Sequence, residues 1–214
     1  MWGLTSYFNM KKALLILTAL SSLPLLAQEQ VVEEDAAPMI IPMEEGARQL
    51  TWYEIDPGVR KYLILLTANT MELSAQLPDG GVNPSPEQSF DMMEPVIRRT
   101  PMDSLTGEYL QFVTEANELN YRIIATLKEE KPQNHAGVFA ITNRFQGEID
   151  ALNAKYPQAS RYFSQSAQME IAMLLTRELD IQRVMIQAAM AGKTQQEAMK
   201  TVVEHLRYEA EHQF

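Results

Sequence analysis

The chain of 214 residues contains no cysteine, which excludes disulfide bonds, thiolate metal sites, cysteine catalysis and a lipid anchor on cysteine. Glycine is scarce, with 9 residues, and no G-x-S-x-G, G-x-x-x-x-G-K-[ST], H-E-x-x-H or dinucleotide-binding glycine pattern occurs. Three histidines are present, and their spacing completes no metal-binding motif. We therefore expect no catalytic residues, no metal site and no cofactor.

Basic residues are in the minority, with 18 lysines and arginines against 28 acidic residues and a formal net charge of −10. This balance argues against nucleic acid or anionic lipid as the main partner. Hydrophobic residues make up 46% and charged residues 21% of the chain, as in an ordinary globular protein rather than a disordered one.

The start of the chain is typical of a secretory signal peptide. Met10, Lys11 and Lys12 precede the apolar segment ALLILTALSSLPLLA. This segment is interrupted by serines and a proline and falls short of the roughly 20 residues that span a bilayer, so we expect its removal. Residues 1–27 are then the signal peptide, with translation starting at Met1 or at Met10. The mature protein is expected in a periplasm or outside the cell, without a transmembrane segment.

Residues 28–48 form an acidic stretch that two prolines interrupt, Pro38 and Pro42. We interpret this stretch as a flexible leader before a helical domain of residues 49–214. Between the prolines lies one apolar patch, residues 39–41, which either docks on the domain or a partner or is incidental. Residues 49–55, with the sequence QLTWYEI, predict a short strand or an extended lead-in.

Apolar residues at helical spacing predict an all-α, single-domain bundle of about five helices. The longest run without proline or glycine, residues 159–191, is expected to form a long central helix that ends at Gly192. The other four helices are expected to begin at Asp56-Pro57, at Thr100-Pro101, at Asn134, with an apolar stripe running to Tyr156, and at Thr194, which has Glu197 as its capping-box partner.

Residues 80–100 predict one long loop, because they contain Pro84, Pro86 and Pro95 after two glycines. Within this loop, the sequence Ser85-Pro86-Glu87-Gln88 could start a single turn of helix. A loop of this length is either a functional segment or a surface connection between two helices.

Three polar residues are candidates for the core. Glu178 and Gln182 fall in the apolar arc of the expected central helix, one turn apart, and Asn120 lies on the buried side of another helix. A carboxylate in a core acts as a general acid or base, or it hydrogen-bonds across the bundle and sets the packing. We expect pairing, with Arg122, Asn120 or a tyrosine hydroxyl as the partner of Glu178.

The chain contains 13 methionines. Met169 and Met173 lie one turn apart toward the polar side of the expected central helix, and Met92 and Met93 lie in the expected loop. Such thioethers could bind Cu(I), cover a hydrophobic partner as an interaction surface, or pack in the core.

One histidine pattern is similar to part of a metal-binding motif. Glu209 and His212 have the spacing of helical di-iron ligands, with His205 one turn earlier, but no second copy of the motif exists. We interpret these residues as a solvated polar face.

Two classes of function follow from these observations. The first is an exported protein without catalysis that binds another envelope protein or an unfolded client, as a scaffold or chaperone-like module. The alternative is a small exported enzyme built around Glu178, or a copper carrier built around the methionines. We favour the first class, because no nucleophile or second acid is paired with Glu178 by spacing.

Overall fold

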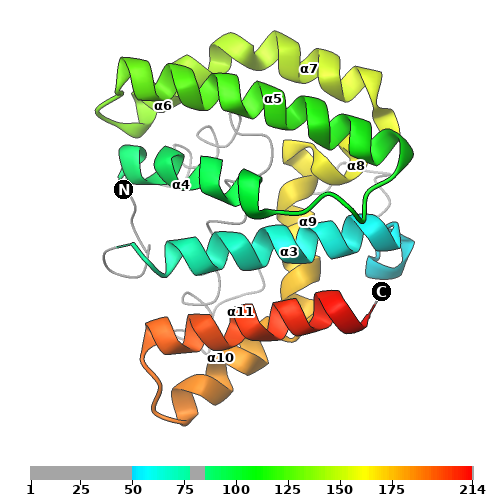
Figure 1. Ribbon diagram of the computed structural model, residues 1–214, viewed down its shortest axis with the longest axis vertical. Coiled ribbons are helices and arrows are strands. Elements are labelled where there is room, and N and C mark those ends of the chain that lie inside the picture. Colours follow the sequence, from blue (N-terminus) through cyan, green and yellow to red (C-terminus); the bar gives the residue numbers. More distant parts are fainter. Residues whose placement is uncertain (1–49, 78–84, 214) are drawn as a thin grey trace, which may run out of the picture.

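The computed structural model describes residues 50–77 and 85–213, and within these ranges the chain forms helices and no strand (Figure 1). The predicted all-α class is confirmed, and the helices form a single body. The expected signal peptide and leader lie outside the described residues. The stretch that predicted a strand or an extended lead-in contains a short 3-10 helix, η2.

The described elements outnumber the five helices predicted from the sequence. In chain order they are η2 Trp52–Glu54, α3 Pro57–Ser74, α4 Pro86–Arg99, α5 Gly107–Glu130, α6 His135–Thr142, η4 Asn143–Phe145, α7 Gln146–Lys155, α8 Pro157–Phe163, α9 Gln165–Glu178, α10 Ile181–Met190 and α11 Gln195–His212.

Four of these helices lie side by side in the order α5, α4, α3, α11, each antiparallel to its neighbour (Figure 1). Helices α6 and α7 cover the outer side of α5, and α10 lies against α11 at the other end of the molecule. Helices α8 and α9 run across this row from behind. The row places α3 in the interior, between α4 and α11.

Helix α3 is therefore the central helix, and 12 of its 18 residues are buried. Its predicted start is confirmed: the Asp56 carboxylate accepts the backbone N–H groups of Gly58 at 2.8 Å and Val59 at 3.3 Å, and Pro57 occupies the first helical position. The backbone of the α4–α5 connection passes close to this first turn, where the Ser104 hydroxyl donates to the Gly58 carbonyl at 2.9 Å.

The prediction of one long helix over residues 159–191 is wrong. The run divides into α8, α9 and α10, with Ser164 in an extended conformation and Asp180 in the left-handed region at a φ of 51°. Serine and aspartate favour such breaks because their side chains compete with helical hydrogen bonding, and aspartate tolerates positive φ. The break at Ser164 also lets Phe163 stack on Phe112 of α5, with ring centroids 5.6 Å apart. The expected stop at Gly192, with a φ of 74°, is confirmed.

The prediction of a long loop over residues 80–100 is wrong for its described part, because α4 begins at Pro86. The start signal forms a complete capping box: the Ser85 hydroxyl accepts from the Gln88 N–H, and the Gln88 side chain accepts from the Ser85 N–H. Pro95 stands inside the helix. Its cost is offset by an apolar face that is buried against α3 and α5, formed by Phe90, Met93, Val96 and Ile97.

Two further helices differ from expectation. The connection after Thr100 is not helical at once, and α5 begins at Gly107. The helix expected from Asn134 to Tyr156 begins at its predicted cap, where the Asn134 side chain accepts from the Gly137 N–H at 2.9 Å. It is then interrupted by η4 around Asn143, a weak helix former.

Candidate functional site

A pocket of about 400 Å³ lies between the first turn of α4 and the end of α5. Polar residues form most of its lining, which consists of Ser85, Glu87, Phe90, Asp91, Lys128, Lys131, Pro132 and Gln133. The Lys128 ammonium is bonded to Glu94 at 2.8 Å and lies 3.8 Å from Asp91. The positive charge of Lys128 is thus already balanced by two carboxylates of α4.

The first polar core candidate, Glu178, lies at the end of α9 with 22% of its side chain exposed, rather than in the middle of the core. Its carboxylate accepts from the neighbouring Arg177 at 2.8 Å, and the expected partner Arg122 instead pairs with Glu148 of α7. Gln182 is half-buried on α10. Since α9 and α10 are separate helices, the structure does not place Glu178 and Gln182 one turn apart on a common axis.

The second polar core candidate, Asn120, is 1% exposed on α5. It lies one turn after Asn117, whose amide donates to the Met102 sulfur at 3.6 Å. Tyr62 of α3 is buried near Asn117, and burial raises the pKa of the Tyr62 hydroxyl. Within the described residues, the amide nitrogen of Asn120 has no hydrogen-bond partner. Asn120 therefore belongs to a polar part of the α3–α5 core and does not pair with Glu178.

The four methionines proposed as an interaction surface separate into two groups. Met92 and Met93 are buried in the core, where the Ser74 hydroxyl contacts the Met92 sulfur at 3.4 Å. On α9, Met169 is half-buried, whereas 47% of Met173 is exposed. Met92 and Met93 are therefore removed from the proposed surface, and Met173 remains.

Exposed apolar side chains continue on α10. Ile186 is 50% exposed and Met190 is 84% exposed, and they lie one turn apart on the outer side of the helix. Ile181 and Ala188, in contrast, are buried. Sequence reasoning missed Ile186 as an exposed residue, because a single helical wheel over residues 159–191 assigned it to the buried arc.

The turn between α9 and α10 is held by α11. A ring nitrogen of His205, Nε2, lies 2.8 Å from the carbonyl oxygen of Leu179, and Nδ1 lies 3.9 Å from Glu209. The ring of His212 instead stacks on Tyr208, with centroids 4.0 Å apart. Among the described side chains, no group of three or more His, Asp and Glu residues could hold a metal ion.

The described chain enters the fold beside α9. The backbone N–H of Leu50 donates to the Glu170 carboxylate at 2.5 Å, and Leu50 and Trp52 are buried. The guanidinium of Arg60 lies over the Trp52 ring, 5.7 Å from its centroid. These contacts hold Leu50, the first described residue, beside α9.

Neither a protein-family model, nor a curated protein, nor a solved structure matches this chain. In the described part of the chain, every helix is too short or too polar to cross a membrane.

Proposed function

We propose that this chain is an exported helical protein without catalysis that binds an apolar segment of another protein, either an envelope protein or an unfolded client. The observation that carries this proposal is the exposure of Ile186 and Met190, which lie one turn apart on the outer side of α10. Large apolar side chains that are exposed next to one another are a feature of protein-binding surfaces.

The chemistry of these side chains suits a partner of variable sequence. Methionine is unbranched and has a polarizable sulfur, so it repacks against different apolar surfaces at low cost. Met190, at the end of α10, is more exposed than Ile186. The contact between His205 of α11 and Leu179 fixes the start of α10, the helix that carries Ile186 and Met190.

Three ion pairs between helices support a function without catalysis. The carboxylates of Glu94, Glu115 and Glu148 each bind a lysine or arginine of a neighbouring helix, namely Lys128, Lys155 and Arg122. Such pairs across helices stabilise the packing and leave these carboxylates poorly suited to proton transfer.

The test compares two variants of the chain from Gln28 onward. Ile186→Glu combined with Met190→Glu places charges on the outer side of α10, and Leu110→Glu is the matched control, because Leu110 is 37% exposed on α5. Reduced insulin serves as the aggregating client, and light scattering reports its aggregation. We expect the double variant to lose suppression of aggregation and the control to retain it.

A second measurement covers a folded partner. If the intact protein does not suppress aggregation, stoichiometric co-purification of one envelope protein, lost in the α10 double variant and kept in Leu110→Glu, still supports the proposal. Equal behaviour of wild type, double variant and control in both assays would contradict it.

A further inference from the structure

We propose that the apolar patch Met39-Ile40-Ile41 of the chain's own leader docks on α9 beside Met173. The proposed contact is intramolecular and involves residues 39–41 of the leader and the side chains of Met169 and Met173 on α9. The contact does not depend on whether Ile186 and Met190 bind another protein.

Leu50, the first described residue, lies close to Met173. Because the Leu50 N–H donates to the Glu170 carboxylate, the described chain begins at α9. Glu170 and Met173 are three residues apart in the same helix, so their Cβ atoms lie roughly 5–6 Å apart on one face. The entry point of the leader is therefore next to the exposed methionine.

Two methionines on neighbouring turns of α9, Met169 and Met173, form the surface on which the patch would dock. Met173 is 47% exposed, and the half-buried Met169 lies one turn before it. Two adjacent thioethers offer an apolar, adaptable surface of the size of a few side chains. This surface suits a short apolar segment better than a folded domain.

The segment between Ile41 and Leu50 is long enough for the patch to reach Met173. Ile41 precedes Leu50 by nine residues, which span up to about 30 Å when extended. Helix α9 has 14 residues and is therefore about 21 Å long. The apolar patch can thus reach any position along α9 from the anchored Leu50. A tether of this length provides an effective concentration on the order of mM, so a weak three-residue contact is populated without a large interface.

Disulfide formation tests the contact directly, because the chain from Gln28 onward contains no native cysteine. The test variant carries Ile40→Cys and Met173→Cys, and the control carries Ile40→Cys and Leu110→Cys on α5. After mild oxidation, non-reducing electrophoresis and mass spectrometry measure the intramolecular bond. We expect the bond to Cys at position 173 to form about tenfold faster than the bond at position 110. Equal rates, or a disulfide-linked dimer in place of the intramolecular product, would overturn the proposal.

A second measurement uses the native methionine and avoids any change in the folded body. Replacement of Met39, Ile40 and Ile41 by serine removes the patch. Hydrogen peroxide then oxidises exposed methionines to the sulfoxide, which mass spectrometry quantifies at each position. We expect oxidation of Met173 to become several-fold faster, while that of Met190, the control on α10, stays unchanged. An unchanged rate at Met173 would also overturn the docking, and the aggregation assay on Ile186 and Met190 is independent of that outcome.

Discussion

Glu108 of α5 caps a different helix: its carboxylate accepts the backbone N–H of Ala159, in the first turn of α8, at 3.1 Å. The same oxygen accepts the N–H of Gln158 at 2.8 Å. Helix α8 has no side-chain cap of its own, since Tyr156 stands at its N-cap position. A residue that lies 51 positions earlier in the chain thus satisfies two of the free N–H groups of this helix.

We expect Glu108→Ala to lower the free energy of unfolding by about 0.5–2 kcal/mol, the range found for the loss of a capping side chain. Glu108→Gln keeps an acceptor oxygen and should cost less. Urea denaturation followed by circular dichroism measures both variants, and Glu118→Ala, an exposed position on the same helix, is the control. A loss in Glu108→Ala no larger than in the control would show that α8 does not need the cap.

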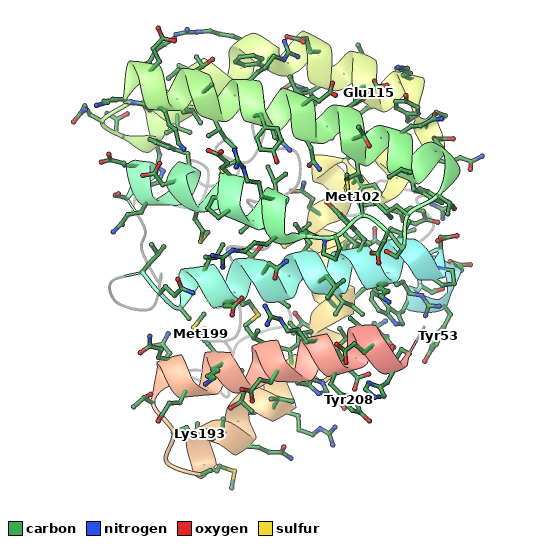
Figure 2. All side chains as sticks on the ribbon, in the orientation of Figure 1. Tyr53, Met102, Glu115, Lys193, Met199 and Tyr208 are labelled. Carbon is green, nitrogen blue, oxygen red and sulfur yellow. The ribbon has the colours of Figure 1, made fainter. Side chains whose placement is uncertain are left out.

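A pH dependence is expected from the contact between α5 and the end of α7. Glu115 lies on α5 facing α7 (Figure 2), where its carboxylate binds Lys155 at 2.7 Å and accepts from the Tyr156 hydroxyl at 2.6 Å. The hydrogen bonds from Lys155 and then Tyr156 hold the pKa of the Glu115 carboxyl below its ordinary value of 4.5. A lowered pKa stabilises the folded state above pH 4.5, and this stabilisation is lost as the pH falls through the lowered value.

We therefore expect Glu115→Gln to be less stable than wild type at pH 7, by no more than about 1 kcal/mol because the pair is largely exposed. The difference should shrink between pH 7 and pH 3, because the wild-type carboxyl takes up its proton as the pH falls through its lowered pKa. Thermal melts at both values measure it. A difference that is the same at pH 7 and pH 3 would mean that the charge of Glu115 does not matter.

Gly58 lies where the α4–α5 connection passes over the first turn of α3. A Cβ atom at this position would lie 2.0 Å from the carbonyl oxygen of Ser104, a backbone atom that cannot move away alone. We expect Gly58→Ala to destabilise the fold by about 1–3 kcal/mol, as overpacking does. The control is Gly147→Ala in α7, where an added Cβ meets no atom within 4 Å. Melting temperatures should fall in the first variant and stay equal or rise in the control, since alanine favours helix.

Glu178 provides a prediction that differs from the one its sequence position favours. On a single wheel it stands in an apolar arc, which predicts a large loss of stability on removal. In the structure it is partly exposed and bonded to its neighbour Arg177. We expect Glu178→Ala to change the free energy of unfolding by less than about 1 kcal/mol. A loss of several kcal/mol in a urea titration would contradict the observed exposure.

Four helix starts could be predicted from the sequence because their signals are local, whereas the start expected at Thr100-Pro101 lies seven residues before α5. Asp56, Ser85, Asn134 and Thr194 all cap helices in the structure, and each acts on backbone groups within three residues of itself. The apolar spacing of the helices likewise predicted the all-α class. These features depend on neighbours along the chain and require no knowledge of the tertiary packing.

The interruptions could not be predicted in this way. The break at Ser164 accompanies the packing of Phe163 against Phe112 of α5, a contact that the spacing along the chain does not show, and the tolerance of Pro95 within α4 depends on the burial of Val96 and Ile97. The same limit applies to the candidate residues. The predicted arc of residues 159–191 assumed one straight axis, so it placed both Glu178 and Ile186 on the buried side, whereas Glu178 is partly exposed and Ile186 is exposed. Both errors arise because tertiary contacts decide where a helical run ends.

The pairing of α3 with α11 joins the two ends of the described chain. Met199 of α11 is buried between these helices (Figure 2), and Arg207 binds Glu72 of α3 across 135 positions of sequence. During synthesis, the central helix is made early but lacks one of its flanking helices until α11 has emerged. Until then, the side of α3 that α11 covers has no partner helix, so the helices made earlier cannot complete their packing around it.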